Sequence, residues 1–166
     1  MEKNLQSEEA LAKFKELVED IKVCMFITNN MDEDHTRPMA TIETEENGTL
    51  WFFTDVRSIK VEEVAKEQNV HLVYAHPGIE SYLDVWGMAE VVTDKKEIED
   101  KWKPIVKAWF PEGKDDPNLA LLKVRPEQSY YWDATSGKMI QFLKMAASIA
   151  TGASLAEGKE GDLKLS

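Results

Sequence analysis

The chain has 166 residues and a mass of 18.9 kDa, and 31 acidic side chains outnumber 20 Lys and Arg side chains, which gives a formal net charge of −11. This length is typical of one domain. The excess of acid repels nucleic acid and anionic membranes, so we expect neither as a partner. Because Cys24 is the single cysteine, an intramolecular disulfide and a thiolate-rich metal site are excluded.

The N-terminus is charged from its second residue and lacks the apolar core of a signal peptide. No apolar run approaches the roughly 20 residues that a membrane-spanning helix requires. We therefore expect a cytoplasmic protein.

The first half of the chain is predicted to form a helix followed by a hairpin of strands. The helix begins at Ser7, whose hydroxyl can cap backbone donors, and Glu8 and Glu9 lie in its first turn, where the helix dipole favours acid. Strands are predicted over residues 23–28, 37–44 and 49–54. Asn47 and Gly48 supply a hairpin turn, because this pair tolerates positive φ angles.

The second half alternates short helices and strands. Helices are predicted over residues 58–68, 95–109 and 136–151, and strands over 71–75, 82–92, 119–124 and 128–132. Pro104 should bend or interrupt the helix that contains it, because proline lacks a backbone donor, and Pro126 should lie at a bend or an edge. Residues 152–166 are expected to be a flexible tail. The pattern favours a mainly β fold, an antiparallel sheet or barrel with flanking helices.

Histidine and cysteine do not form a recognisable metal or nucleophile site. His35, His71 and His76 lack the spacing of metal ligands, and Cys24 lies in an apolar run that is typical of a buried core thiol. No motif of a serine hydrolase, a P-loop nucleotide triphosphatase or a dinucleotide-binding fold is present. We therefore predict no metal and assign no catalytic residue.

Polar side chains on the hairpin and on the helix after it are candidates for binding an anion. Arg37 can form a bidentate pair with phosphate oxygens. Ser58 can cap a helix whose N-terminus offers N–H groups to a phosphate, and Lys60 adds a positive charge. Thr54 and Arg57 belong to the same set. The alternative is a capped helix with solvated cations, which would bind nothing.

Tryptophan is concentrated in the second half of the chain. Trp86 and Trp102 are expected to fill the core. Trp109 and Trp132 border polar loops, so a ligand contact, a dimer contact or a core position remains open for each.

Several motifs occur in a fixed order along the chain. They are R-P-M-A-T at 37–41, L-W-F-F-T-D-x-x-S-x-K at 50–60, G-M-A-E at 87–90, W-F-P-E-G-x-D-D-P-N-L-A-L-L-K-V at 109–124 and Y-Y-W-D at 130–133. Between about Val23 and Asp133 the chain resembles the FMN-binding split barrels related to pyridoxamine 5'-phosphate oxidase. The branch to which it is most similar is that of the bacterial general stress proteins.

The resemblance implies one antiparallel split β-barrel domain over residues 1–151, which works as a homodimer with one FMN at each end of the subunit interface. Ser58 and Lys60 would hold the phosphate, and Trp109 would approach from its own loop or from the partner subunit. The cofactor-binding residues implied are Arg37, Pro38, Met39, Ala40, Thr41, Phe53, Thr54, Ser58, Lys60, Tyr82, Trp109 and Trp132.

Two departures from the oxidase pattern limit what the resemblance implies. Ile59 stands where the oxidase usually has a basic residue, so phosphate binding should be weaker or Arg57 should substitute. The Arg- and His-containing segment that grips the vitamin phosphate is also missing after Asp133. We therefore expect an FMN-dependent oxidoreductase of the general stress protein type that is not a true pyridoxamine phosphate oxidase. The alternatives are a non-catalytic flavin-binding stress or storage protein and a split barrel that binds haem or another cofactor.

Overall fold

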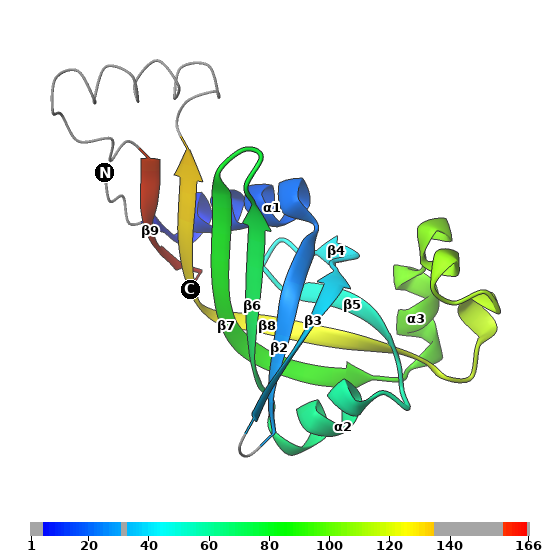
Figure 1. Ribbon diagram of the computed structural model, residues 1–166. Coiled ribbons are helices and arrows are strands. Elements are labelled where there is room, and N and C mark those ends of the chain that lie inside the picture. Colours follow the sequence, from blue (N-terminus) through cyan, green and yellow to red (C-terminus); the bar gives the residue numbers. More distant parts are fainter. Residues whose placement is uncertain (1–4, 31–32, 135–157, 166) are drawn as a thin grey trace, which may run out of the picture.

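The computed structural model describes residues 5–30, 33–134 and 158–165 (Figure 1). The strands in these ranges are β1 (Leu5–Gln6), β2 (Val23–Asn30), β3 (Glu33–Ala40), β4 (Glu43–Thr44), β5 (Leu50–Asp55), β6 (Asn69–His76), β7 (Ser81–Val92), β8 (Leu119–Ala134) and β9 (Gly158–Lys164). The α-helices are α1 (Ser7–Ile21), α2 (Ile59–Lys66) and α3 (Lys95–Lys101), and the 3-10 helices are η1 (Pro104–Ala108) and η2 (Gly113–Asp115).

The strands form one mostly antiparallel sheet, in the order β1-β9-β8-β7-β6-β2-β3. The long strand β8 organises it, because β7 pairs along one edge of β8 while β5 and β9 pair with successive halves of the other edge. The pair of β1 and β9 is parallel. Figure 1 shows α3 beyond one end of the sheet and β9 at the opposite end. The predicted mainly β, antiparallel fold with flanking helices is confirmed.

The main core lies on one face of this sheet and is built by simple alternation. Cys24 and Phe26 on β2 point inward, whereas Val23 and Met25 point outward. The helix α1 covers the inner face, and its Phe14 is fully buried there. The predicted start of this helix at Ser7 is confirmed.

A smaller core lies on the other face, under α3 and η1. Trp51, Phe53 and Leu121 point outward from β5 and β8 and pack against side chains of the two helices. Pro104 interrupts the helical segment as predicted, because α3 ends at Lys101 and η1 begins at the proline. Trp102 packs edge-on against Phe53, with ring centroids 5.7 Å apart.

The structure joins the two predicted strands 119–124 and 128–132 into the single strand β8. The register with β7 shifts between Trp86 and Gly87, opposite Pro126. A Cβ atom at Gly87 would lie only 2.5 Å from the carbonyl oxygen of Arg125. Glycine at this position therefore permits the close approach of β7 and β8.

The structure differs from the sequence-based expectation at two other places. Residues 158–164, part of the stretch expected to be a flexible tail, form β9, which pairs with β8 and buries Leu163 in the main core. Trp86, predicted to fill the core, is 43% exposed on the outer face of β7. The predicted helix over 136–151 lies outside the described residues. Within the described ranges, the helices fall short of the length and apolar character that a bilayer span demands.

Candidate functional site

The cavity that gathers most of the predicted site residues, called here the main cavity, has a volume of about 570 Å³. It lies between β3, the end of β5 with the start of α2, and the segment from η1 to Pro111. The predicted residues that line it are Pro38, Met39, Ala40, Phe53, Thr54, Lys60 and Trp109. The sequence motifs from three separate segments therefore meet at one place.

Lys60 supplies the positive charge of the main cavity. Burial lowers the pKa of its ammonium group, and the nearby charge of Arg37 lowers it further, whereas Asp55 acts in the opposite direction. Within the described ranges Lys60 makes no hydrogen bond or ion pair. A partly desolvated cation without a partner is costly, so an anion in this cavity would relieve it.

The side-chain oxygens of Ser58 and Thr54 are 3.3 Å apart. Thr54 lines the main cavity together with Lys60, whereas Ser58 lies behind Thr54 and is not part of the wall. Ser58 occupies the N-cap position of α2, but its side chain makes no capping hydrogen bond, so that part of the prediction is wrong. Its carbonyl oxygen instead accepts from the backbone N–H of Val61 at 3.1 Å. The Ser58 hydroxyl therefore has no capping bond to give up when it donates to a ligand.

Arg57 and Asp55 form an ion pair at the rim of the same cavity. The guanidinium donates to both carboxylate oxygens, at 3.0 and 2.6 Å, and these bonds lower the pKa of Asp55 to about 2. Asp116 lines the cavity nearby. Because its charge is matched by Asp55, Arg57 is a weaker candidate than Lys60 for holding an anion.

Arg37 is held outside the wall of the main cavity by Glu63. Its guanidinium donates to Thr28 Oγ1 at 2.6 Å and to Glu63 Oε2 at 3.2 Å. The buried Glu63 carboxylate also contacts the Thr28 hydroxyl and the His35 ring. Burial alone would raise the pKa of Glu63, but the hydrogen bonds from Thr28, His35 and Arg37 outweigh it and lower that pKa.

The remaining predicted residues lie elsewhere. The hydroxyl of Thr41 is 2.6 Å from that of Tyr74, and Thr41 lines a different hollow, beside α1. Tyr82 and Trp132 face each other across β7 and β8 and line a hollow of about 240 Å³ on the outer face of the sheet. They are 38% and 49% exposed. One chain therefore does not bring its own Tyr82 and Trp132 to the main cavity.

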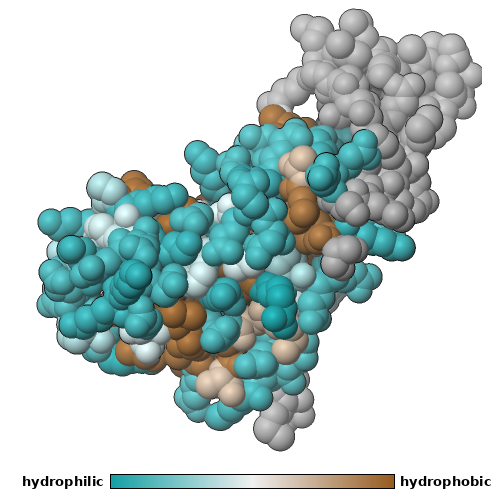
Figure 2. Space-filling view, turned by 180° about the vertical axis from the view of Figure 1, so that it is seen from behind, coloured by the Kyte–Doolittle hydropathy of each residue, from teal (hydrophilic) through white to brown (hydrophobic). Residues whose placement is uncertain are grey.

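Apolar side chains make up much of the remaining wall. Trp109 is 62% exposed, and Phe110 and Pro111 line the cavity beside it. In the sequence, the W-F-P run at 109–111 was the feature that pointed to Phe110 and Pro111. Val23 and Val106 also line the cavity, but no motif or pattern in the sequence marked them as site residues. Figure 2 shows that the face opposite to the view of Figure 1 has apolar patches set among hydrophilic side chains.

The main cavity combines apolar and aromatic side chains with the unpaired cation Lys60. The titratable groups that line it are Asp55, Arg57, Lys60 and Asp116, so no histidine or thiol serves as a general acid or base in its described wall. Burial raises the pKa of the Cys24 thiol to about 12, which makes it a poor nucleophile. No group of three or more metal-ligating side chains converges within the part of the chain that the structure describes. The arrangement suits a ligand with a flat ring at one end and an anionic group at the other.

Three known proteins are similar to this chain in sequence or in fold. General stress protein 26 of Bacillus subtilis is 31% identical over 119 residues, which cover 69% of this chain and 82% of that protein. Protein bli-3 of Neurospora crassa is 25% identical over 126 residues, which are 70% of this chain but only 60% of the length of bli-3. The crystal structure of the general stress FMN/FAD binding protein from Xanthomonas citri is 26% identical, with a TM-score of 0.69 over 79% of this chain and 93% of that chain.

The family model described as pyridoxamine 5'-phosphate oxidase like matches residues 9–156. This span includes β2 to β8 and every residue of the main cavity. The chain belongs to the pyridoxamine 5'-phosphate oxidase-like family.

Proposed function

We propose that the main cavity binds FMN and that the protein is a flavin-dependent oxidoreductase of the general stress protein type. The observation that carries the proposal is Lys60, a partly desolvated cation without a partner in the described ranges, which lies at the start of a helix and lines the cavity together with Thr54. The name of the Xanthomonas citri relative supports a flavin as the ligand.

The residues present fit such a group. A phosphate needs a cation and hydrogen-bond donors, which Lys60, Ser58 and Thr54 supply together with the N-terminus of α2. A flat ring system needs an apolar wall, which Phe53 and Trp109 supply in the same cavity. The two requirements are met within one cavity of suitable size.

When bound, FMN supplies hydride or electron transfer, and the protein supplies its position and surroundings. Lys60 and Ser58 hold the phosphate end, while Trp109 and Phe110 limit the access of water to the ring end. The described wall holds no histidine or thiol, and its carboxylates are Asp55, which is paired with Arg57, and Asp116.

We infer that the protein is a homodimer in which the partner completes the site. Tyr82 and Trp132 are implied in flavin binding by the family resemblance, yet they lie in a separate hollow on the outer sheet face. This face also exposes Met25, Val23 and Trp86, an unusual set of apolar side chains for a monomer. A second copy that covers this face would place its own Tyr82 and Trp132 toward the main cavity of the first.

The binding proposal is tested by titrating the protein with FMN and with riboflavin, which lacks the phosphate. Lys60→Ala should weaken FMN binding by one to two orders of magnitude, because a charge-assisted contact is worth roughly 1.5 to 3 kcal/mol. It should leave the affinity for riboflavin unchanged. Lys66→Ala is the matched control, since Lys66 lies on the same helix but is exposed and paired with Glu62. An equal FMN affinity in Lys60→Ala and the parent would refute the assignment.

Catalysis is tested separately on the FMN-loaded protein. Oxidation of a reduced pyridine nucleotide with an added electron acceptor, faster than with free FMN, would support the oxidoreductase. Flavin binding without any such turnover would favour the non-catalytic flavin-binding protein. A haem spectrum in the purified protein would contradict both.

A further inference from the structure

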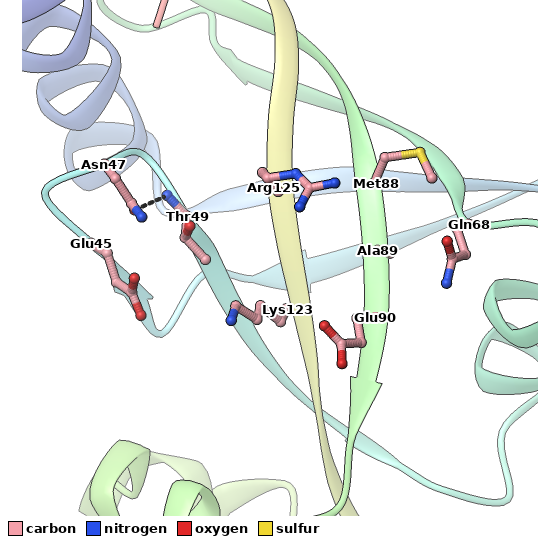
Figure 3. Close-up of a pocket in the computed structure, with 9 residues that line it drawn as sticks. All are labelled: Glu45, Asn47, Thr49, Gln68, Met88, Ala89, Glu90, Lys123 and Arg125. Carbon is pink, nitrogen blue, oxygen red and sulfur yellow. Dashed lines mark hydrogen bonds between the residues drawn. The ribbon is translucent and has the colours of Figure 1, made fainter. Parts of the chain in front are cut away.

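A second cavity of about 250 Å³ lies apart from the main cavity (Figure 3). It is lined by β7 and β8, by the turn between β4 and β5, and by Gln68 before β6. The G-M-A-E motif, which has no role in the main cavity, supplies Met88, Ala89 and Glu90 to its wall.

Two cations from β8 line this cavity. Lys123 and Arg125 are two residues apart on the strand, so their side chains point to the same face. Neither forms an ion pair with a carboxylate of the described ranges, and the Arg125 guanidinium makes no hydrogen bond there. The ammonium group of Lys123 lies over the ring of Trp51, 5.4 Å from its centroid. Two neighbouring cations left without acidic partners are unexpected in a chain with a net charge of −11.

The backbone holds the Arg125 end in place. The register shift beside Gly87 brings β7 so close to β8 that a Cβ atom at position 87 would lie 2.5 Å from the Arg125 carbonyl oxygen. Met88 lies directly opposite Arg125 in the pairing of the two strands. A paired strand, rather than a loop, therefore carries Arg125, so the backbone at this position is ordered before a ligand binds.

The two carboxylates at the cavity limit which anion it suits. Glu45 is already engaged, since it accepts a hydrogen bond from Trp51 Nε1 at 2.7 Å and lies 3.6 Å from the Lys101 ammonium group. Glu90 is exposed and stands opposite Lys123 across the strands. Two cations and one unengaged carboxylate leave a single net positive charge, which one carboxylate group of a ligand would neutralise.

We propose that this second cavity binds a small organic monocarboxylate, held by the Arg125 guanidinium and the Lys123 ammonium group. The guanidinium matches both oxygens of a carboxylate, and the Lys123 charge adds to it. The side-chain amides of Asn47 and Gln68 also line the cavity, and Met88 offers an apolar contact to the carbon chain of the ligand. This site is independent of flavin binding.

The test is an NMR titration of the full chain with propionate, and with propionamide as the neutral ligand of equal size. Propionate should bind in the millimolar range and shift the backbone amides of residues 88–90 and 123–125, with or without excess FMN. Propionamide should cause no saturable shift. Arg125→Gln should weaken propionate binding at least tenfold, and Arg125→Lys by less, because it keeps the charge but loses the planar fork. Lys66→Gln, an exposed lysine paired with Glu62, is the control and should change nothing.

The proposal is overturned if propionamide binds as well as propionate, or if Arg125→Gln leaves propionate binding unchanged while the protein stays folded. Inorganic phosphate is the third probe. Binding of phosphate more tightly than propionate would overturn the assignment to a monocarboxylate.

Discussion

Glu63 shows how a single buried charge is stabilised in this protein. Its side chain is 4% exposed and is surrounded by the Thr28 hydroxyl, the His35 ring and the Arg37 guanidinium. Removing one partner from such a cluster leaves the others without compensation. The cluster also sets the position of Arg37, which the family resemblance places at the cofactor.

Glu63→Gln should lower the free energy of unfolding by about 2 to 3 kcal/mol, because Arg37 and His35 lose a charged partner; Arg37 keeps some contact with solvent, which limits the loss. Denaturant unfolding at neutral pH measures the change. Glu62→Gln on the same helix, at an exposed position, is the control and should shift stability by less than about 0.5 kcal/mol. A loss no greater than that of the control would show that the cluster contributes nothing to stability.

The same residue predicts a dependence of stability on pH. The pKa of Glu63 is lower in the folded state than its ordinary value of 4.5, so its stabilising contribution is complete above that pH and is lost as the pH falls below it. Between neutral pH and the acid range, Glu63→Gln should therefore lose less stability than the parent chain. Parallel loss in both proteins, measured by denaturant unfolding across this range, would contradict the prediction.

Among the elements, β9 is the one whose contribution the sequence did not indicate. Residues 158–164 are rich in glycine and charge, and they contain Leu163 as their one large apolar side chain. That side chain is 2% exposed in the main core, opposite Ser129 of β8. A strand with so weak a local signal depends on pairing with β8 and on burying this leucine.

Leu163→Ala should destabilise the protein by about 2 to 4 kcal/mol, because it leaves a cavity in the main core. Lys164→Ala is the matched control, since this neighbouring side chain is exposed. Thermal or denaturant unfolding compares the two. A change for Leu163→Ala as small as that for Lys164→Ala would favour the flexible tail that the composition predicts.

At the scale of the whole molecule, the proposed dimer requires the outer sheet face to be an interface. Met25→Glu places a charge at the exposed middle of this face, so the monomer should still fold while the dimer should dissociate. Light scattering at micromolar concentration should give twice the chain mass for the parent and the chain mass for the variant. Ile105→Glu is the control, because Ile105 is also apolar and exposed but lies on η1. A monomeric parent protein would contradict the proposal.

The FMN-loaded protein should oxidise pyridoxamine phosphate little or not at all. A phosphate ester needs several converging donors outside the site of the flavin phosphate, and the three arginines are Arg37, Arg57 and Arg125. Arg37 is bound to Glu63, Arg57 to Asp55, and Arg125 lines the second cavity. Formation of pyridoxal phosphate and hydrogen peroxide well above a free-FMN control would contradict this expectation, and Lys138 would then be the first residue to replace.

The sequence by itself determined the features that depend on local periodicity and on motifs. The apolar spacing of α1, the inward and outward alternation of β2, and the interruption at Pro104 follow from residues close together in the chain. The ordered motifs also identified the family, and seven of the cofactor residues predicted from them line the main cavity.

Only the tertiary structure decided the features that depend on contacts between distant residues. It paired Arg37 with Glu63, placed β9 beside β8, and separated Tyr82 and Trp132 from the main cavity. It also brought Lys123 and Arg125 together with the turn that follows β4. Desolvation and long-range pairing set these outcomes, and neither can be read from the spacing of residues along one segment.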